Sequence, residues 1–167
     1  MNTRKITEFG LLLAVSLVLA YFESLLPVMI AVPGVKLGIA NIVTMLILYR
    51  WGMKQAFFFM TLRIVMAGFL FSGITGILYS FAGGVFCIIA MSVMKKISFF
   101  SKMGVSMAGA VFHNLGQILI AVIVMENAHI LYYFPVLCLT GLISGFAVGY
   151  ISTLLIKWFE LMFPKEL

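Results

Sequence analysis

Six long apolar runs, separated by short links, account for almost the whole chain. Only 10% of the residues are charged, against about 25% in a typical soluble domain, and about 20 apolar residues are enough for a helix to cross a membrane. The pattern therefore predicts an all-α integral membrane protein, a bundle of six transmembrane helices that forms one domain over residues 1–167. The predicted spans are residues 6–30, 36–49, 55–71, 76–93, 104–125 and 130–158.

Lysine and arginine are unevenly distributed among the links. If six spans alternate in direction, the two ends of the chain and the links near Arg50 and Lys95 lie on one side, and they hold most of the basic residues. The links at 72–75 and 126–129 hold none. The positive-inside rule therefore predicts cytoplasmic N- and C-termini, which explains the net charge of +6 without nucleic-acid binding. The first run is long for a signal-peptide core, so we expect an uncleaved first helix.

Two of the eleven basic residues, Lys36 and Arg63, do not fit this topological pattern. Arg63 lies near the middle of the third run, and Glu23 lies near the end of the first. An ionisable residue at the centre of a transmembrane helix costs roughly 2.5–3.5 kcal/mol on insertion scales, so it usually faces the bundle interior. Two interpretations remain open: Glu23 and Arg63 form a structural ion pair, or they bind a ligand. Lys36 either binds the same ligand or extends to the outer surface.

The fifth run carries three polar residues, His113, Asn114 and Gln117, on one helical face. Such a face in mid-membrane either lines a ligand site or makes hydrogen bonds to another helix. Tyr79 in the fourth run is a further candidate, although a tyrosine near a helix end commonly anchors at the membrane interface.

The link over residues 33–41 precedes a short second run and holds Lys36 and Asn41. Irregular backbone at membrane depth must be buried in protein or line a cavity, so we expect this link to dip into the protein. With Lys36 and Arg63 opposed by a single glutamate, Glu23, the cavity is electropositive. The sequence therefore predicts a solute that is anionic and partly apolar.

The chain contains no aspartate and no GxxxxGK[ST] motif. The first absence excludes the usual magnesium-diphosphate site of prenyl transferases, and the second excludes a phosphate-binding loop for ATP. Cys87 and Cys138 lie inside apolar runs without metal-ligand spacing, and His113 has no carboxylate partner in its own run. We therefore expect no catalytic residue, cofactor or metal, and any ATP hydrolysis must come from another subunit.

Small residues at four-residue spacing let membrane helices approach closely. They are Gly10 with Ala14 and Ser16 with Ala20 on the first run, and Gly141, Gly145 and Gly149 on the sixth. We expect the stripe on the sixth run to pack inside the bundle. For the pairs on the first run, internal packing and contact with another protein both remain open.

Several sequence strings resemble the Gx transporter family, which also carries the label heptaprenyl diphosphate synthase component I. They include PGVKLGIAN at residues 33–41 and HNLGQ at residues 113–117, together with residues 23–27, 62–63 and 79–80. The chain also resembles the S components of energy-coupling-factor (ECF) transporters. That resemblance implies a multi-pass protein of the bacterial cell membrane that captures a vitamin-like or precursor solute from outside.

The resemblance further implies that a T component and two cytoplasmic ATPases are partners, contacted through Gly10, Ala14 and Ala20. It implies a lid formed by Pro33, Gly34 and Val35, and the synthase label suggests an isoprenoid or quinone-precursor solute. The expected solute-binding residues are Glu23, Lys36, Asn41, Arg63, Tyr79, His113, Asn114 and Gln117. The alternative is a membrane accessory subunit of a prenyl diphosphate synthase; a purely structural scaffold leaves the buried polar residues unexplained.

Overall fold

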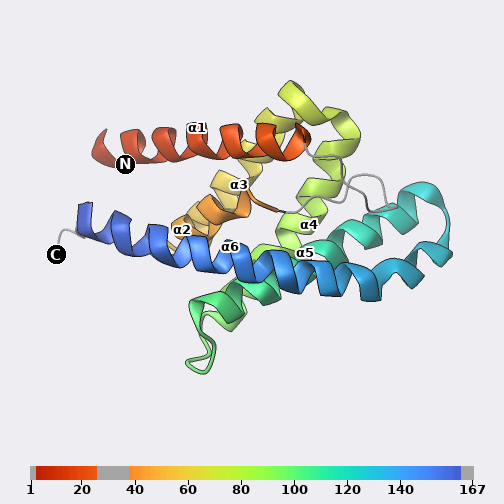
Figure 1. Cartoon of the computed structure of the whole chain (residues 1–167). Helices are drawn as coiled ribbons and strands as arrows, with labels where there is room; N and C mark the ends of the chain where they lie inside the picture. Colours follow the sequence, from red (N-terminus) through yellow and green to blue (C-terminus); the bar gives the residue numbers. More distant parts are fainter. Residues whose placement is uncertain (1–2, 26–37, 163–167) are drawn as a thin grey trace.

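The computed structural model describes residues 3–25 and 38–162, which are almost entirely helical, without a β-strand in these ranges (Figure 1). The α-helices are α1 Thr3–Leu25, α2 Asn41–Arg50, α3 Met53–Ala67, α4 Gly73–Met94, α5 Lys102–Met125 and α6 Phe134–Met162. A π-helical turn, η1 Gly68–Ser72, precedes α4, and a 3-10 helix, η2 Ala128–Tyr133, precedes α6. The predicted second helix thus begins at Asn41 rather than at residue 36.

Four helical stretches of the described chain are long and apolar enough to cross a membrane: Thr3–Leu25, Met53–Lys96, Lys102–Met125 and Ala128–Met162. Their outward faces are apolar, with Phe69, Ile74 and Ile143 each more than 70% exposed, a surface suited to lipid rather than water. The chain is therefore a multi-pass membrane protein. By contrast, α2 has 10 residues and covers only about 15 Å of the roughly 30 Å hydrocarbon core.

The stretch Met53–Lys96 folds back on itself at Gly73. Gly73 has φ +68°, in the left-handed region that favours glycine, and the sequence predicted a link here. A Cβ added to Gly84 would lie 2.3 Å from Met60 Sδ, and one added to Gly68 would lie 2.0 Å from Ile77 Cγ1. Gly84, later in α4, thus faces Met60 of α3, and Ile77, early in α4, faces Gly68 of η1. The segment formed by α3 and η1 and the helix α4 therefore form an antiparallel hairpin.

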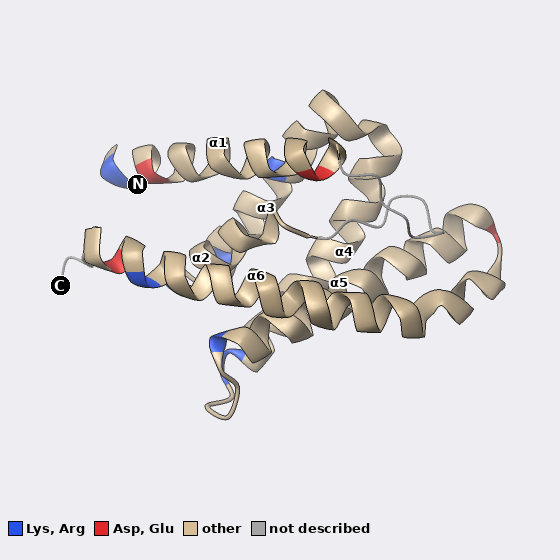
Figure 2. Cartoon of the chain, viewed as in Figure 1, with Lys and Arg blue, Asp and Glu red and all other residues tan. Residues whose placement is uncertain are grey.

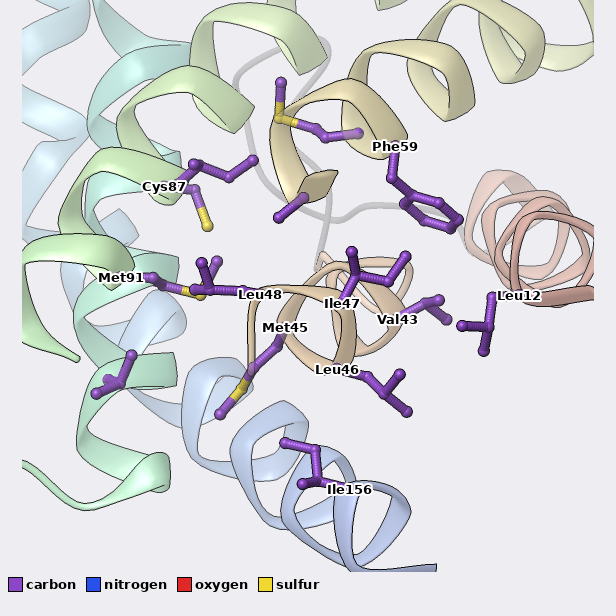
Figure 3. Close-up of a cluster of buried hydrophobic side chains, with 14 of the residues drawn as sticks. Leu12, Val43, Met45, Leu46, Ile47, Leu48, Phe59, Cys87, Met91 and Ile156 are labelled. Carbon is purple, nitrogen blue, oxygen red and sulfur yellow. The ribbon is translucent and has the colours of Figure 1, made fainter. Parts of the chain in front are cut away.

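The short helix α2 lies at the centre of the bundle. All of its residues from Ile42 to Leu48 are buried, as expected for a helix that is apolar on every side. It packs against α1, α3 and α6, and the apolar cluster around it includes Leu12, Phe59, Met91 and Ile156 (Figure 3). Burial on all sides explains how a helix too short to span the membrane is held in place.

Helices α4, α5 and α6 are in backbone contact through glycines. A Cβ added to Gly116 of α5 would lie 2.6 Å from the carbonyl oxygen of Ala82 on α4, and one added to Gly145 of α6 would lie 2.7 Å from Met107 Cα on α5. Close approach through small residues is the usual way for helices to associate in lipid. The prediction that the glycine stripe of α6 packs inside the bundle is confirmed.

Both described ends of the chain, Thr3 and Met162, and most of the basic residues lie toward one end of the molecule (Figures 1 and 2). Contacts between segments distant in sequence hold this end together: the Phe9 and Trp51 ring centroids are 6.3 Å apart, Arg50 lies 5.3 Å above the Phe159 ring, and Lys95 lies 4.7 Å above the Tyr49 ring. The one-sided charge distribution expected from the links is therefore present. Its assignment to the cytoplasm stays a prediction.

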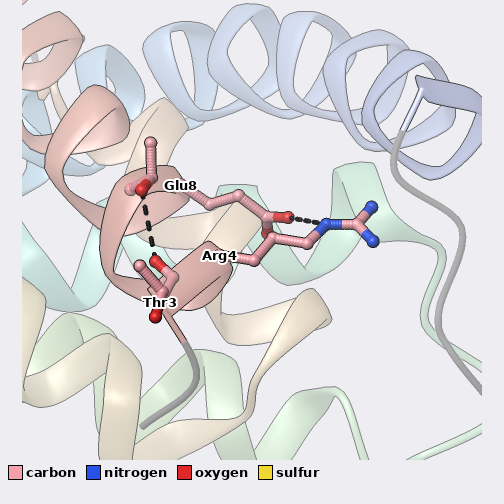
Figure 4. A network of polar contacts seen from close by, with 4 residues as sticks. Thr3, Arg4 and Glu8 are labelled. Carbon is pink, nitrogen blue, oxygen red and sulfur yellow. Dashed lines mark hydrogen bonds and ion pairs between the residues drawn. The ribbon is translucent and has the colours of Figure 1, made fainter.

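Helix α1 begins with a local polar network at this end (Figure 4). Arg4 Nε donates a hydrogen bond to Glu8 Oε1 at 3.2 Å, and the Thr7 hydroxyl donates to the Thr3 carbonyl at 3.2 Å. Glu8 is buried, and the Arg4 guanidinium neutralises its charge. Beyond this turn, most of the outer face of α1 is exposed.

Candidate functional site

Polar side chains from each of the six α-helices α1 to α6 line two small adjoining cavities in the middle of the bundle. Their volumes are about 20 Å³ for the first and about 30 Å³ for the second. Gly38, Asn41 and His113 line both cavities, so the cavities meet at these residues. We call the polar lining, which comprises Glu23, Gly38, Asn41, Arg63, His113 and Asn114, the polar seam.

The second cavity contains a chain of hydrogen bonds that runs from α1 to α3. The Glu23 carboxylate accepts a hydrogen bond from the Gly38 backbone N–H, and the Gly38 carbonyl accepts one from the Asn41 N–H at 2.9 Å. Asn41 Oδ1 then accepts from Arg63 Nη2 at 3.2 Å. Gly38 has φ +78°, which a residue with a side chain rarely adopts. The turn before α2 therefore links the two charged residues.

Within the described residues, Glu23 and Arg63 form no direct ion pair; the salt bridge found there joins Arg4 and Glu8. Both seam residues are buried, Glu23 at 4% and Arg63 at 7% exposure, and both line the second cavity. Arg63 Nε has no hydrogen-bond partner in this part of the chain. A buried charged donor without a partner is costly, so Arg63 Nε is a donor that an acceptor within its reach would stabilise.

Asn114 connects α5 to α6 beside the first cavity. Its Nδ2 donates a hydrogen bond to the Leu137 carbonyl at 2.7 Å, while the residue also lines the cavity. Of the two interpretations of the polar face of α5, the hydrogen bond to another helix is confirmed for Asn114, and ligand binding stays a prediction. Ser106 and Ser144 line the same cavity and were missed from the sequence. Ser106 precedes His113 by seven residues, and this spacing places the two on one helical face.

Two predicted site residues, Tyr79 and Gln117, line neither cavity. Tyr79 packs in an apolar cluster with Ile118, Ala121 and Leu137. Gln117 is fully buried against α4, where a Cβ added to Gly83 would lie 2.9 Å from Gln117 Cγ. We therefore leave both out of the proposed site, whereas Ser80, the neighbour of Tyr79, lines the second cavity.

The remaining predicted residues lie on the exposed face of α1, in the second cavity, or outside the described residues. Gly10 and Ala14 are exposed on α1, and a Cβ added to Gly10 would meet nothing within 4 Å. Ala20 instead lines the second cavity with Glu23. The predicted solute contact Lys36 and the predicted lid residues Pro33, Gly34 and Val35 lie outside the described residues. Over the described ranges, no three His, Cys, Asp or Glu side chains are grouped to hold a metal ion.

Comparison with known proteins gives one match. The family model for heptaprenyl diphosphate synthase component I matches residues 12–155, which include the described members of the polar seam and all of α2 to α5. No curated protein matches the chain, and no solved structure does. Because the family model covers most of its length, the chain belongs to the heptaprenyl diphosphate synthase component I family.

Proposed function

We propose that this protein is the substrate-binding (S) subunit of an ECF-type importer and that it captures a small anionic, partly apolar solute. Prenyl diphosphates and aromatic quinone precursors are the solute classes that suit the charge of the site and the family label. The observation that carries the proposal is Arg63, a guanidinium buried in mid-bundle, lining a cavity and held by Asn41 with its Nε left open. Buried ionisable residues in membrane helices commonly mark a solute path.

The solute site must open before it can bind. Each cavity, at about 20 or 30 Å³, has room for little more than a water molecule, whereas small-molecule sites measure about 300–1,000 Å³. The hydrogen bonds from Gly38 to Glu23 and from Arg63 to Asn41 close the space between α1, the turn before α2, and α3. In our proposal, an anionic group replaces Asn41 as a partner of Arg63 and widens this space.

Transport energy comes from other subunits in this proposal. The sequence holds no phosphate-binding loop, so two cytoplasmic ATPases and a T component supply the power stroke. The exposed pair Gly10 and Ala14 on α1 is the proposed contact with the T component, because small residues allow another helix to approach closely.

The second candidate function is an accessory membrane subunit of a prenyl diphosphate synthase. The family description favours it, and the absence of aspartate places catalysis in another chain. The two functions differ in the partner: an ECF module in the first, and a soluble synthase subunit in the second.

Co-purification distinguishes the two. The tagged protein is expressed with a T component, its two ATPases and the prenyl synthase subunit of the same organism. We expect a detergent-stable complex with the ECF module that is lost on Ala14→Trp. Ala147→Trp is the matched control, since Ala147 is likewise an exposed alanine, on α6, and this variant keeps the complex. Recovery of the synthase subunit without the ECF module overturns the transport proposal.

A further inference from the structure

An apolar groove lies on the outer surface between α4 and α5, away from the polar seam. Its volume is about 310 Å³ and it has no polar lining; the residues that line it are Phe86, Ile89, Ala90, Val93, Met94 and Phe112. Ile89, Val93 and Phe112 are 50%, 54% and 39% exposed, so the groove opens to the surroundings of the helix bundle. In a membrane those surroundings are hydrocarbon.

The size and walls of the groove suit a lipid tail. Its lining residues on α4 extend over about two helical turns, from Phe86 to Met94. Its walls are phenyl rings and aliphatic or thioether side chains, and Ala90 is the one small residue among them. Close helix packing in lipid favours rows of small residues, which this surface lacks.

A lysine follows the face of α4 that lines the groove. Lys96 follows Val93 by three residues and Ile89 by seven, a spacing that places all three on one helical face. The Lys96 backbone N–H still bonds the Val93 carbonyl at 3.1 Å, so the helical turn extends to this residue, and Lys96 is exposed. The neighbouring Lys95 is engaged on another side, where its Nζ donates to the Leu48 carbonyl at 2.8 Å.

The other two lysines near this end of α4 face α2 instead of the groove. The Nζ atoms of Lys95 and Lys102 lie 4.7 and 5.7 Å from the centroid of the same Tyr49 ring, so Lys96 is the lysine that the groove-lining face of α4 carries. This basic end is the one that the positive-inside rule assigns to the cytoplasm, where anionic lipids attract lysine side chains. Apolar walls followed along the same helical face by an exposed ammonium group are complementary to an anionic amphiphile.

From this juxtaposition we propose that the groove between α4 and α5 binds an anionic phospholipid, with one acyl chain along the groove and the headgroup phosphate at Lys96. The occupant is a lipid of the surrounding bilayer and is independent of the solute at the polar seam. The lipid site and the transport function can therefore be tested independently of each other.

Native mass spectrometry of the purified protein tests the proposal, with phosphatidylglycerol and phosphatidylcholine of identical acyl chains as the probes. We expect phosphatidylglycerol to bind more tightly. Lys96→Gln removes about a fivefold preference for phosphatidylglycerol over phosphatidylcholine, the effect of one lysine near an anionic headgroup. Lys157→Gln, a change at another exposed lysine, leaves this preference unchanged. Equal affinities for the two lipids overturn the proposal.

Filling the groove gives the second test. Val93→Trp abolishes the retained lipid, and Val124→Trp, at a valine of similar exposure on α5 (50%), does not. Ile89→Trp repeats the test from another exposed position in case Val93→Trp fails to fold. If both groove variants fold and keep the lipid, or if they lose a protein partner instead of lipid, the groove is not a lipid site.

Discussion

The two sides of the polar seam are built differently. On one side, α4, α5 and α6 are in backbone contact, and a Cβ at Gly116 or Gly145 would overlap backbone atoms of the next helix. On the other side, α1 is mostly exposed, and its inner end is joined to the turn before α2 by the hydrogen bond from Gly38 to Glu23. One side is a close-packed wall, and the other is held by polar contacts.

This difference indicates which side moves. An intramolecular hydrogen bond contributes a net 0.5–1.5 kcal/mol or so, whereas separating close-packed helices loses many van der Waals contacts at once. A solute that supplies new partners for Glu23 and Arg63 is therefore able to displace α1 and the turn at Gly38, but not the wall. We infer that the seam opens on the side of α1.

The largest expected effect is a loss of stability when the close contact between α4 and α5 is overpacked. Gly116→Val places a side chain against the Ala82 carbonyl oxygen, and overpacking of this kind costs roughly 1–3 kcal/mol or more. We expect a sharply lower melting temperature in detergent by thermal-shift assay. Gly10→Val, where an added Cβ has open space, is the matched glycine control and leaves the melting temperature unchanged. Equal losses in the two variants contradict the distinction between the wall and α1.

The second-largest expected effect is a loss of affinity for the solute when Arg63 is replaced. A solute at 100 times its dissociation constant stabilises the protein by about 2.7 kcal/mol, so a thermal-shift screen of prenyl diphosphates and aromatic quinone precursors finds the binders. Arg63→Ala removes the buried guanidinium, and a hydrogen bond to a charged group is worth about 1.5–3 kcal/mol. We expect a solute that binds the wild type to lose roughly 10- to 100-fold in affinity for this variant. Expressed as free energy, this loss is larger than the change in the free energy of unfolding of the unliganded protein. Equal affinity in the folded variant removes Arg63 from the site.

The smallest expected effect is the loss of stability when Asn114 is replaced. Asn114→Ala removes the hydrogen bond to the Leu137 carbonyl, and such interhelical bonds average about 0.6 kcal/mol, with a maximum of about 1.7. We expect a melting temperature only slightly below that of the wild type, because glycine contacts still hold α5 to α6. A loss as large as that of Gly116→Val shows that hydrogen bonding, rather than backbone contact, holds the wall together.

The sequence predicted the positions of the helices and part of the seam. Apolar runs located the six α-helices of the described chain, although α2 is too short to span the membrane as predicted. The cost of buried charge pointed to Glu23 and Arg63, and the polar face of the fifth run pointed to His113; all three line one cavity. Helical spacing also placed Gln117 beside His113, but it does not show that Gly83 of α4 packs against Gln117. Similarly, the sequence left a direct pair between Glu23 and Arg63 open as one of two interpretations, because the Gly38 N–H that bonds Glu23 becomes visible only in the folded chain.

The central claim is that α1 moves relative to a rigid wall, and distances between spin labels test it directly. Labels at Val18→Cys on α1 and Ile123→Cys on α5 report on the moving side, and labels at Leu78→Cys on α4 and Ile143→Cys on α6 report on the wall. All four positions are at least 48% exposed, and Cys138→Ser removes the more accessible native thiol. In lipid nanodiscs we predict a broad or two-peaked distance distribution for the first pair and a single narrow peak for the second. Equally narrow distributions for both pairs, with and without a solute found by the thermal-shift screen, would contradict the account.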